Sequence, residues 1–185
     1  MTKTEARKLA KACRAAVDLH TVGHAMAGVL FALPAWQHAD TVLAFASMPD
    51  EPDTADILRQ ALAEGKRLLL PRVLSRTEMD WVEITALSQL QPRAYGILEA
   101  PASLPAFDTA HLGDGALALI PCLAASPDGV RLGRGGGYYD RFLAHYKGKR
   151  LLVCPTAALL GDLPCEGWDV RFSPHEILTE KGILL

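Results

Sequence analysis

The chain has 185 residues, of which half are hydrophobic and 22% are charged, and its formal net charge is −2. This size and composition are typical of one globular domain, and a charge this small without a basic block argues against nucleic acid as the main partner. No apolar stretch reaches the length of a membrane span. We therefore expect one domain over residues 1–185, a monomer, and no nucleic-acid or membrane partner.

Four cysteines occur in the chain, at positions 13, 122, 154 and 165. None of them has the C-x-x-C spacing of a redox or metal motif, and no secretory signal precedes them. They are interpreted as reduced and mostly buried thiols, which predicts a cytoplasmic location.

The first third of the chain is predicted to contain two helices. Thr4 is a candidate N-cap for a helix that ends near Val17, with Leu9 and Cys13 on its apolar stripe. The side facing water would carry four basic residues: Arg7, Lys8, Lys11 and Arg14. A second helix should cover Thr21 to Leu33. His20 and His24 have a spacing that can ligate zinc, but no third ligand is near, so a surface or capping role is favoured.

Buried strands alternate with helices along the rest of the chain. The expected strands are Thr41–Ser47, Arg67–Val73, Ala116–Cys122 and Lys149–Cys154, and Met79–Ile84 has the pattern of an edge or hairpin strand. A helix capped by Asp53 or Thr54 should end near Gly65. This alternation predicts an α/β fold with a largely parallel sheet. Ligands bind beyond the carboxyl ends of such strands, so the loop from Ser47 to Asp53 is well placed for function.

The most distinctive segment is Arg131-Leu-Gly-Arg-Gly-Gly-Gly-Tyr-Tyr-Asp-Arg141. Gly135 to Gly137 carry no side chains, so this backbone can turn tightly, adopt positive φ and approach a ligand. A helix from Tyr138 to Tyr146 should follow directly, and its free N–H groups and dipole favour an anion. Arg131 and Arg134 can bind phosphate oxygens through two N–H groups each. The segment therefore predicts a polyphosphate site.

Two common phosphate-binding patterns do not fit this segment. No Lys-Ser or Lys-Thr follows the glycines, and Tyr138 stands where the dinucleotide fingerprint needs a third glycine. A plain turn is the alternative for the glycines alone. Asp140 can hold Mg²⁺ beside phosphates, because Mg²⁺ commonly takes one or two carboxylates plus phosphate oxygens. Its alternative role is to complement the helix dipole without a metal.

The segment 131–141 closely resembles the RLGxGxGYYD motif of the 5-formyltetrahydrofolate cyclo-ligase family, also called 5,10-methenyltetrahydrofolate synthetases. The resemblance covers nearly the whole chain and continues through Pro71-Arg72-Val73, Met79-Asp80-Trp81, Tyr95-Gly96-Ile97 and Glu99-Ala100-Pro101. It implies a single three-layer α/β domain. It also implies the ATP- and Mg²⁺-dependent conversion of 5-formyltetrahydrofolate to 5,10-methenyltetrahydrofolate, with release of ADP and phosphate after the formyl oxygen has been phosphorylated.

The resemblance further implies which residues form the site. ATP would be bound by Lys3, Arg7, Arg131, Gly133, Arg134, Gly135, Gly136, Gly137, Tyr138 and Tyr139. The folate substrate would be contacted by Ala46, Glu51, Trp81, Tyr95, Arg134, Gly135, Gly136, Gly137 and Tyr138. Mg²⁺ would lie on Asp140 and Asp169, and Arg134 and Tyr138 would be the catalytic residues.

Three of these residues also have chemistry that suits a pterin. Glu51 can accept hydrogen bonds from the N–H groups of the pterin, although a solvated loop acid is the simpler interpretation of its position. Trp81 and Tyr95 can stack on a flat ring, although buried aromatic side chains more often belong to a core.

The chain departs from the family pattern in three places. Ala100 separates Glu99 from Pro101, where the family usually has Glu-Pro directly. The chain has Pro121-Cys122 and Ala125-Ser126 where the family typically has Pro-Gly and Phe-Asp. It has Gly167-Trp168-Asp169 where the family often has Glu-His-Asp, and the stretch after Asp169 is longer than usual. Two other functions therefore stay open: a folate- or nucleotide-binding protein without turnover, and a different small phosphotransferase or phosphosugar enzyme that uses the same loop.

Overall fold

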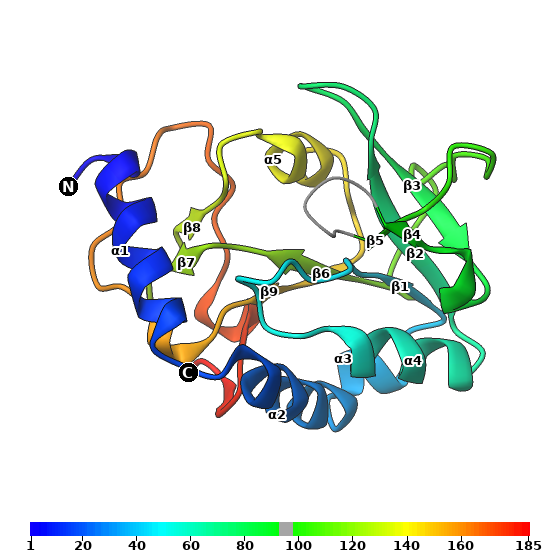
Figure 1. Cartoon of the computed structure of the whole chain (residues 1–185), viewed down its shortest axis with the longest axis horizontal. Helices are drawn as coiled ribbons and strands as arrows, with labels where there is room; N and C mark the ends of the chain where they lie inside the picture. The colour runs from blue at the N-terminus through cyan, green and yellow to red at the C-terminus, as the bar shows by residue number, and fades with distance from the viewer. Residues whose placement is uncertain (93–97) are drawn as a thin grey trace.

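The computed structural model describes residues 1–92 and 98–185. Its central strands are β1 (Thr41–Leu43), β2 (Arg67–Val73), β3 (Met79–Ile84), β6 (Ala116–Pro121), β9 (Lys149–Val153), β10 (Ile177–Thr179) and β11 (Gly182–Ile183). They form one sheet in the order β11-β10-β9-β6-β1-β2-β3 (Figure 1). The strands from β10 to β2 in this order are parallel, whereas the edge strands β3 and β11 are antiparallel to their neighbours. The largely parallel sheet expected from the sequence is confirmed.

Two short antiparallel pairs and several helices complete the described parts of the chain. The pairs are β4 (Gln91–Pro92) with β5 (Leu98–Glu99), and β7 (Ala124–Ala125) with β8 (Arg131–Leu132). The helices are α1 (Lys3–Ala15), α2 (Leu19–Phe31), α3 (Pro34–Gln37), α4 (Ala55–Ala63) and α5 (Tyr138–Leu143). Short 3₁₀ turns cover Leu87–Gln89, Thr156–Ala158 and Pro174–Glu176.

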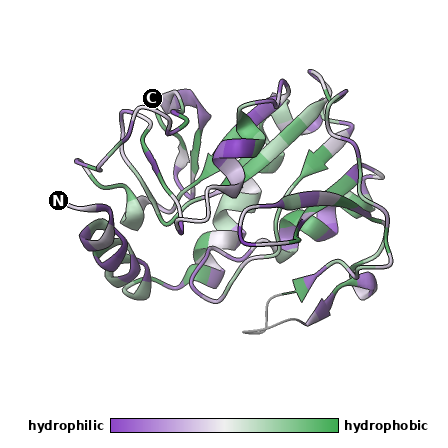
Figure 2. Ribbon diagram, turned by 90° about the horizontal axis from the view of Figure 1, so that it is seen from above, coloured by the Kyte–Doolittle hydropathy of each residue, from purple (hydrophilic) through white to green (hydrophobic). Residues whose placement is uncertain are grey.

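Helices cover both faces of the sheet and give it three layers (Figure 1). On one face, residues of α2 and α4 pack with Leu68 and Leu70 of β2. On the other face, residues of α1 and α5 pack with Leu69. Because both faces are covered, the central strand β6 is hydrophobic along its length instead of alternating, whereas α1 has a hydrophilic outer side (Figure 2). The three-layer α/β fold is therefore as predicted.

The strand predictions hold best where the pattern is strongest. Strands β2 and β3 begin and end at the predicted residues, and they form the expected hairpin at the sheet edge. Strand β1 ends at Leu43 and not at Ser47, because the chain then turns toward the helix that follows. There the Ser47 amide donates to the Thr54 hydroxyl at 3.1 Å, and the Thr54 amide donates to the Ser47 hydroxyl at 3.3 Å. These side-chain bonds replace the sheet pairing that the strand prediction assumed.

Helix α1 differs from its prediction in both its start and its buried face. Thr2 is the N-cap instead of Thr4, and it forms a capping box with Glu5. The buried side holds Ala6, Ala10 and Arg14, whereas Leu9 is 45% exposed. The predicted apolar stripe and the solvated position of Arg14 were therefore wrong. Small alanines allow the helix to approach the protein closely, and the guanidinium of Arg14 finds hydrogen-bond acceptors there.

Helices α2 and α5 are also shifted or shorter than expected. Asp18 caps α2, so the helix begins two residues earlier than predicted, at Leu19, and Pro34 starts the separate helix α3. Helix α5 ends at Leu143 instead of Tyr146. His20 and His24 pair with Asp53 at 2.8 Å and Asp56 at 2.7 Å, respectively, at the surface, as the non-metal interpretation expected.

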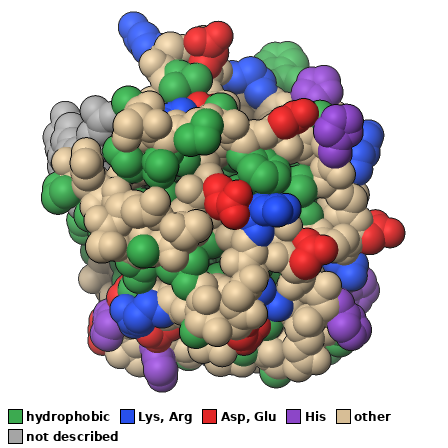
Figure 3. All heavy atoms as spheres, turned by 90° about the vertical axis from the view of Figure 1, so that its right-hand side faces the viewer, with side chains coloured by type: hydrophobic (Ala, Val, Ile, Leu, Met, Phe, Trp, Pro, Cys, Tyr) green, Lys and Arg blue, Asp and Glu red, His purple; other side chains and the backbone are tan. Residues whose placement is uncertain are grey.

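The surface of the molecule agrees with the near-neutral charge. The face seen in Figure 3 shows acidic and basic side chains next to one another and not gathered in one block. Across residues 1–92 and 98–185, no helix combines the length and the apolar character needed to cross a membrane.

Candidate active site

A cavity of about 710 Å³ lies beyond the carboxyl ends of β1, β2 and β6. It is lined by every residue predicted to bind ATP or metal, and by Ala46 and Glu51 from the predicted folate site. The position agrees with the general rule that ligands of an open α/β sheet bind at this edge. Residues from the beginning, middle and end of the chain therefore meet around one space.

The glycine loop forms one wall of this cavity, and its backbone needs the glycines. Gly135 has φ of +100° and Gly137 has φ of +68°, in the region that side chains disfavour. Gly137 is also the N-cap of α5. From α1, Arg7 donates through Nε to the carbonyl of Gly133 at 3.0 Å. The tight backbone expected from the sequence is thus present, and α1 braces it.

Two carboxylates on the same wall are paired with cations. Arg131 Nη2 lies 2.8 Å from Asp140 Oδ2, and Lys3 Nζ lies 2.9 Å from Asp169 Oδ2. Lys3 also contacts Glu166 at 2.6 Å. Burial alone would raise the pKa of Asp169, but hydrogen bonds from Lys3 and from the Glu166 amide outweigh burial, so the pKa is lowered. The carboxylate is therefore ionised, as a metal ligand must be.

The described residues contain no group of three or more His, Cys, Asp or Glu side chains placed to hold a metal ion. A Mg²⁺ ion that keeps waters and phosphate oxygens needs only one or two protein carboxylates. Asp140 and Asp169 both line the cavity and are hard oxygen donors, so they fit such an ion only when a phosphate group completes the coordination.

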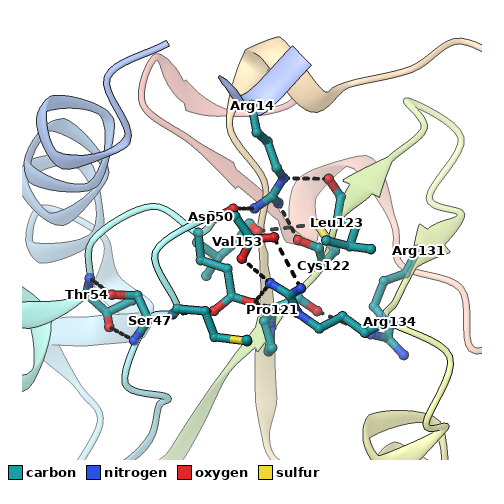
Figure 4. Close-up of polar contacts among 12 residues, drawn as sticks. Arg14, Ser47, Asp50, Thr54, Pro121, Cys122, Leu123, Arg131, Arg134 and Val153 are labelled. Atoms are coloured by element: carbon teal, nitrogen blue, oxygen red, sulfur yellow. Dashed lines mark hydrogen bonds and ion pairs between the residues drawn. The ribbon is translucent and has the colours of Figure 1, made fainter. Parts of the chain in front are cut away.

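Arg134 crosses from the glycine loop to the loop after β1 (Figure 4). Its Nη2 lies 3.0 Å from Glu51 Oε1, and its guanidinium also pairs with the carboxylate of Asp50. Burial would lower the pKa of Arg134, but the two acids raise it above the usual value. Glu51 is itself 8% exposed, and its second oxygen accepts the amide of Met48 at 3.0 Å. Arg134 therefore connects the predicted phosphate and folate sides.

Arg14 is a residue of the site region that the sequence analysis missed. It is 1% exposed and donates to the carbonyls of Leu123 at 2.7 Å, Asp50 at 2.8 Å and Cys122 (Figure 4). It thereby holds the loop after β1 against the segment after β6. Its four-residue spacing from the small residues Ala6 and Ala10 is the sequence signal that marks the buried face of the helix.

The predicted aromatic site residues differ in whether they line the cavity or lie in the core. Trp81 is 3% exposed and packs in the core against Phe142 at 4.9 Å between ring centroids, so it does not line the cavity. The core alternative holds for Trp81. Tyr138 does line the cavity, and its hydroxyl donates to the carbonyl of Ser75 at 2.8 Å. Burial raises the pKa of its neighbour Tyr139, which stays protonated. Tyr95 lies outside the described residues.

Known proteins resemble this chain in sequence and fold. The 5-formyltetrahydrofolate cyclo-ligase family matches residues 2–180. The 5-formyltetrahydrofolate cyclo-ligase of Mycolicibacterium smegmatis is 29% identical over 153 residues, covering 78% of this chain and 76% of that protein. The Escherichia coli K12 protein of the same name is 32% identical over 137 residues, covering 71% and 74%.

A solved structure extends the likeness to three dimensions. The 5,10-methenyltetrahydrofolate synthetase of Aquifex aeolicus superposes with a TM-score of 0.83 at 26% identity, covering 100% of this chain and 92% of that one. The match therefore includes all the elements that form the cavity. With the family match over nearly its whole length, the chain belongs to the 5-formyltetrahydrofolate cyclo-ligase family.

Proposed function

We propose that this cavity carries out the ATP-dependent cyclisation of 5-formyltetrahydrofolate to 5,10-methenyltetrahydrofolate, with release of ADP and phosphate. The observation that carries the proposal is the bridge made by Arg134. Its side chain extends from the glycine loop, where phosphates would bind, and its guanidinium pairs with Glu51, where a pterin would bind. One side chain thus contacts both halves of the space in which two substrates must react.

The phosphate half of the cavity contains four cationic side chains, and a triphosphate could replace the acceptor that each of them now contacts. Lys3, Arg131 and Arg134 pair with carboxylates, and Arg7 bonds a carbonyl. ATP oxygens would take over these donors, because phosphate accepts charge-assisted hydrogen bonds at least as well as a carboxylate. Asp140 and Asp169, released from their partners, would hold Mg²⁺. A bound Mg²⁺ ion would supply positive charge that neutralises the phosphates.

The folate half of the cavity has apolar walls around the buried acid Glu51. Phe45, Leu70 and Met79 line it, and Glu51 is the acid. Apolar walls suit the flat faces of a pterin, and a carboxylate can accept from its N–H groups. Ala46, next to Phe45, contributes a small side chain, which leaves room for a ring. Trp81 has no place in this account, because it is buried in the core.

The reaction needs positioning and charge neutralisation more than an enzyme nucleophile. The formyl oxygen attacks the γ-phosphorus, and the bond from that phosphorus to the bridging oxygen of ADP breaks. N10 then attacks the formyl carbon, and phosphate leaves with the former formyl oxygen. Arg134 and the amides of the glycine loop would stabilise the charge on the transferring phosphoryl group. Tyr138, tied to Ser75 at the rim, would separate the nucleotide from the folate.

The proposal is tested by following the absorbance of methenyltetrahydrofolate in the presence and absence of ATP and Mg²⁺. We expect product only when ATP is present, with one ADP formed per product. Folate binding by calorimetry without ADP release would favour the binding protein instead, and turnover of another phosphate acceptor in a substrate panel would favour a different phosphotransferase. The monomeric state and the cytoplasmic location stay predictions.

A further inference from the structure

Two buried thiols lie next to each other at the floor of the cavity, where β6 and β9 end. Pro121 and Val153 are the last paired residues of these parallel strands, so Cys122 and Cys154 follow as neighbours. Side chains at matching positions of parallel strands point to the same face. Both cysteines accordingly belong to the same apolar cluster, with exposures of 4% for Cys122 and 0% for Cys154.

The geometry of the two strand ends allows a bond between the sulfur atoms. Cys122 Sγ donates to the carbonyl of Val153, the residue directly before Cys154, at 3.4 Å (Figure 4). Neighbouring strands lie about 4.8 Å apart. A disulfide joins residues whose Cα atoms are roughly 4.4 to 6.8 Å apart. The pair can therefore be joined without separating the two strands.

The two thiols differ in access and in charge environment. Cys122 lines the cavity, whereas Cys154 lies behind it. Burial raises the pKa of Cys122, but the neighbouring thiol of Cys154 and the charges of Arg14 and Arg131 outweigh burial and lower the pKa. Burial and the neighbouring Cys122 raise the pKa of Cys154 well above its usual value. Because the thiolate is the reactive form, Cys122 is suited to react first.

We propose that Cys122 and Cys154 form an oxidisable dithiol, and that hydrogen peroxide entering the cavity converts it to a disulfide that stops the ligase reaction. The thiolate of Cys122 attacks the O–O bond, which gives a sulfenic acid and releases hydroxide. The thiol of Cys154 then attacks the sulfenic sulfur, and the S–S bond forms as water leaves. Two thiols lose two electrons, the peroxide gains them, and the hydroxide takes up the proton that Cys122 had lost.

The disulfide would act on the site through the backbone on either side of Cys122. The carbonyl of Pro121 accepts from Arg131 at 3.2 Å, and the carbonyls of Cys122 and Leu123 accept from Arg14. A bond that draws the Cys122 side chain toward β9 moves these acceptors together. Arg131 would then be displaced from the phosphate side. This effect on turnover rests on the proposed function, whereas the thiol chemistry does not.

The first experiment measures the chemistry without any substrate. The full chain, freed of reductant, is treated with hydrogen peroxide, denatured, and titrated for thiols. We expect the four free thiols to fall to two, with one crosslinked peptide pair containing Cys122 and Cys154 in the mass spectrum. Cys154→Ser should lose the crosslink and stop at an oxidised Cys122, whereas the double variant Cys13→Ser, Cys165→Ser should still form it. Four unchanged thiols, or a crosslink to Cys13 or Cys165 instead, would overturn the proposal.

The second experiment measures turnover before and after oxidation. Oxidised chain should lose at least tenfold in methenyltetrahydrofolate formation and regain it with dithiothreitol, whereas Cys154→Ser should fail to show this reversible loss. If the buried serine unfolds the chain, Cys154→Ala replaces it. A crosslink that leaves turnover unchanged would disprove the switch. If the crosslink forms on oxidation but the reduced chain never makes product, the proposed function is refuted and the dithiol proposal is not.

Discussion

Two arginines contact the loop at residues 48–53, one from the protein interior and one from the cavity. They differ in the kind of acceptor that they contact. Arg14 reaches the backbone carbonyl of Asp50 from below, and its three hydrogen bonds go to carbonyls. Arg134 reaches the carboxylate of the same residue from the cavity, with a side chain that is 39% exposed. The neutral carbonyls are held by a buried donor, whereas the carboxylates at the cavity can be exchanged for phosphates. The first contact fixes a structure, and the second can be given up to a ligand.

The largest effect is expected from removing the interior arginine. Arg14→Met takes away donors from buried carbonyls, and each buried group left unsatisfied costs about 1–3 kcal/mol. We expect the free energy of unfolding to fall by roughly 3 kcal/mol or more, measured by urea denaturation. Lys11→Met, at an exposed position of the same helix, is the matched control and should change stability by about 0.5 kcal/mol or less. Equal losses in the two variants would contradict the comparison.

Removing the cavity arginine should lower turnover strongly and stability only slightly. Arg134→Ala is expected to lower turnover by a factor of tens or more, which corresponds to roughly 2 kcal/mol of transition-state stabilisation. Because its ion pairs are partly exposed, the free energy of unfolding should change by only about 1 kcal/mol or less. Arg134→Lys keeps the charge but not the two-pronged donor, and it should recover turnover only in part. Unchanged kcat in Arg134→Ala would remove the proposed role.

A smaller effect on the enzyme reaction is expected from adding a side chain to the glycine loop. A Cβ on Gly136 would lie 2.6 Å from Cε2 of Tyr138, so the ring would have to move and its bond to Ser75 would weaken. Gly136→Ala should therefore raise KM for ATP by several-fold while the fold remains. Gly161→Ala is the control, because a Cβ built there meets no atom within 4 Å beyond its own chain neighbours. A KM that stays the same in both variants would show that this close approach is not needed.

The smallest effect is expected from pH. Burial would raise the pKa of Asp50, but its hydrogen bonds and the charge of Arg134 lower it, and the pKa of Asp169 is lowered as well. Groups with a lowered folded-state pKa stabilise the fold fully above the unfolded value, which is about 3.9 for aspartate. Their contribution is lost as the pH falls below that value. Urea midpoints should therefore drop with acid, and the drop should be less steep in Asp50→Asn. An identical pH profile in the variant would exclude Asp50 from the effect.

The sequence predicted the parts of the molecule that depend on local pattern. A continuous apolar run gave β2 and an alternating run gave β3 with the bounds that the structure shows. The motif at residues 131–141 predicted a loop that does line the cavity. These successes share a cause, because hydrophobic periodicity and glycine content act over a few neighbouring residues.

The features that the sequence did not predict depend on distant partners. The burial of Arg14 is possible only because three carbonyls from two other segments converge on it. Trp81 alternates like a residue free to face a ligand, but Phe142 and Tyr139 of α5 cover it. Asp140 and Asp169 were predicted as metal ligands, and their pairing with Arg131 and Lys3 was not visible in the spacing of the residues.

The contact between Lys3 and Asp169 joins residues that are 166 positions apart in the chain. A ribosome must therefore have made the segment from Lys3 through Asp169 before the nucleotide side of the cavity can assemble. Until then Lys3 lacks its acidic partners, and premature termination upstream of Asp169 would leave an incomplete wall.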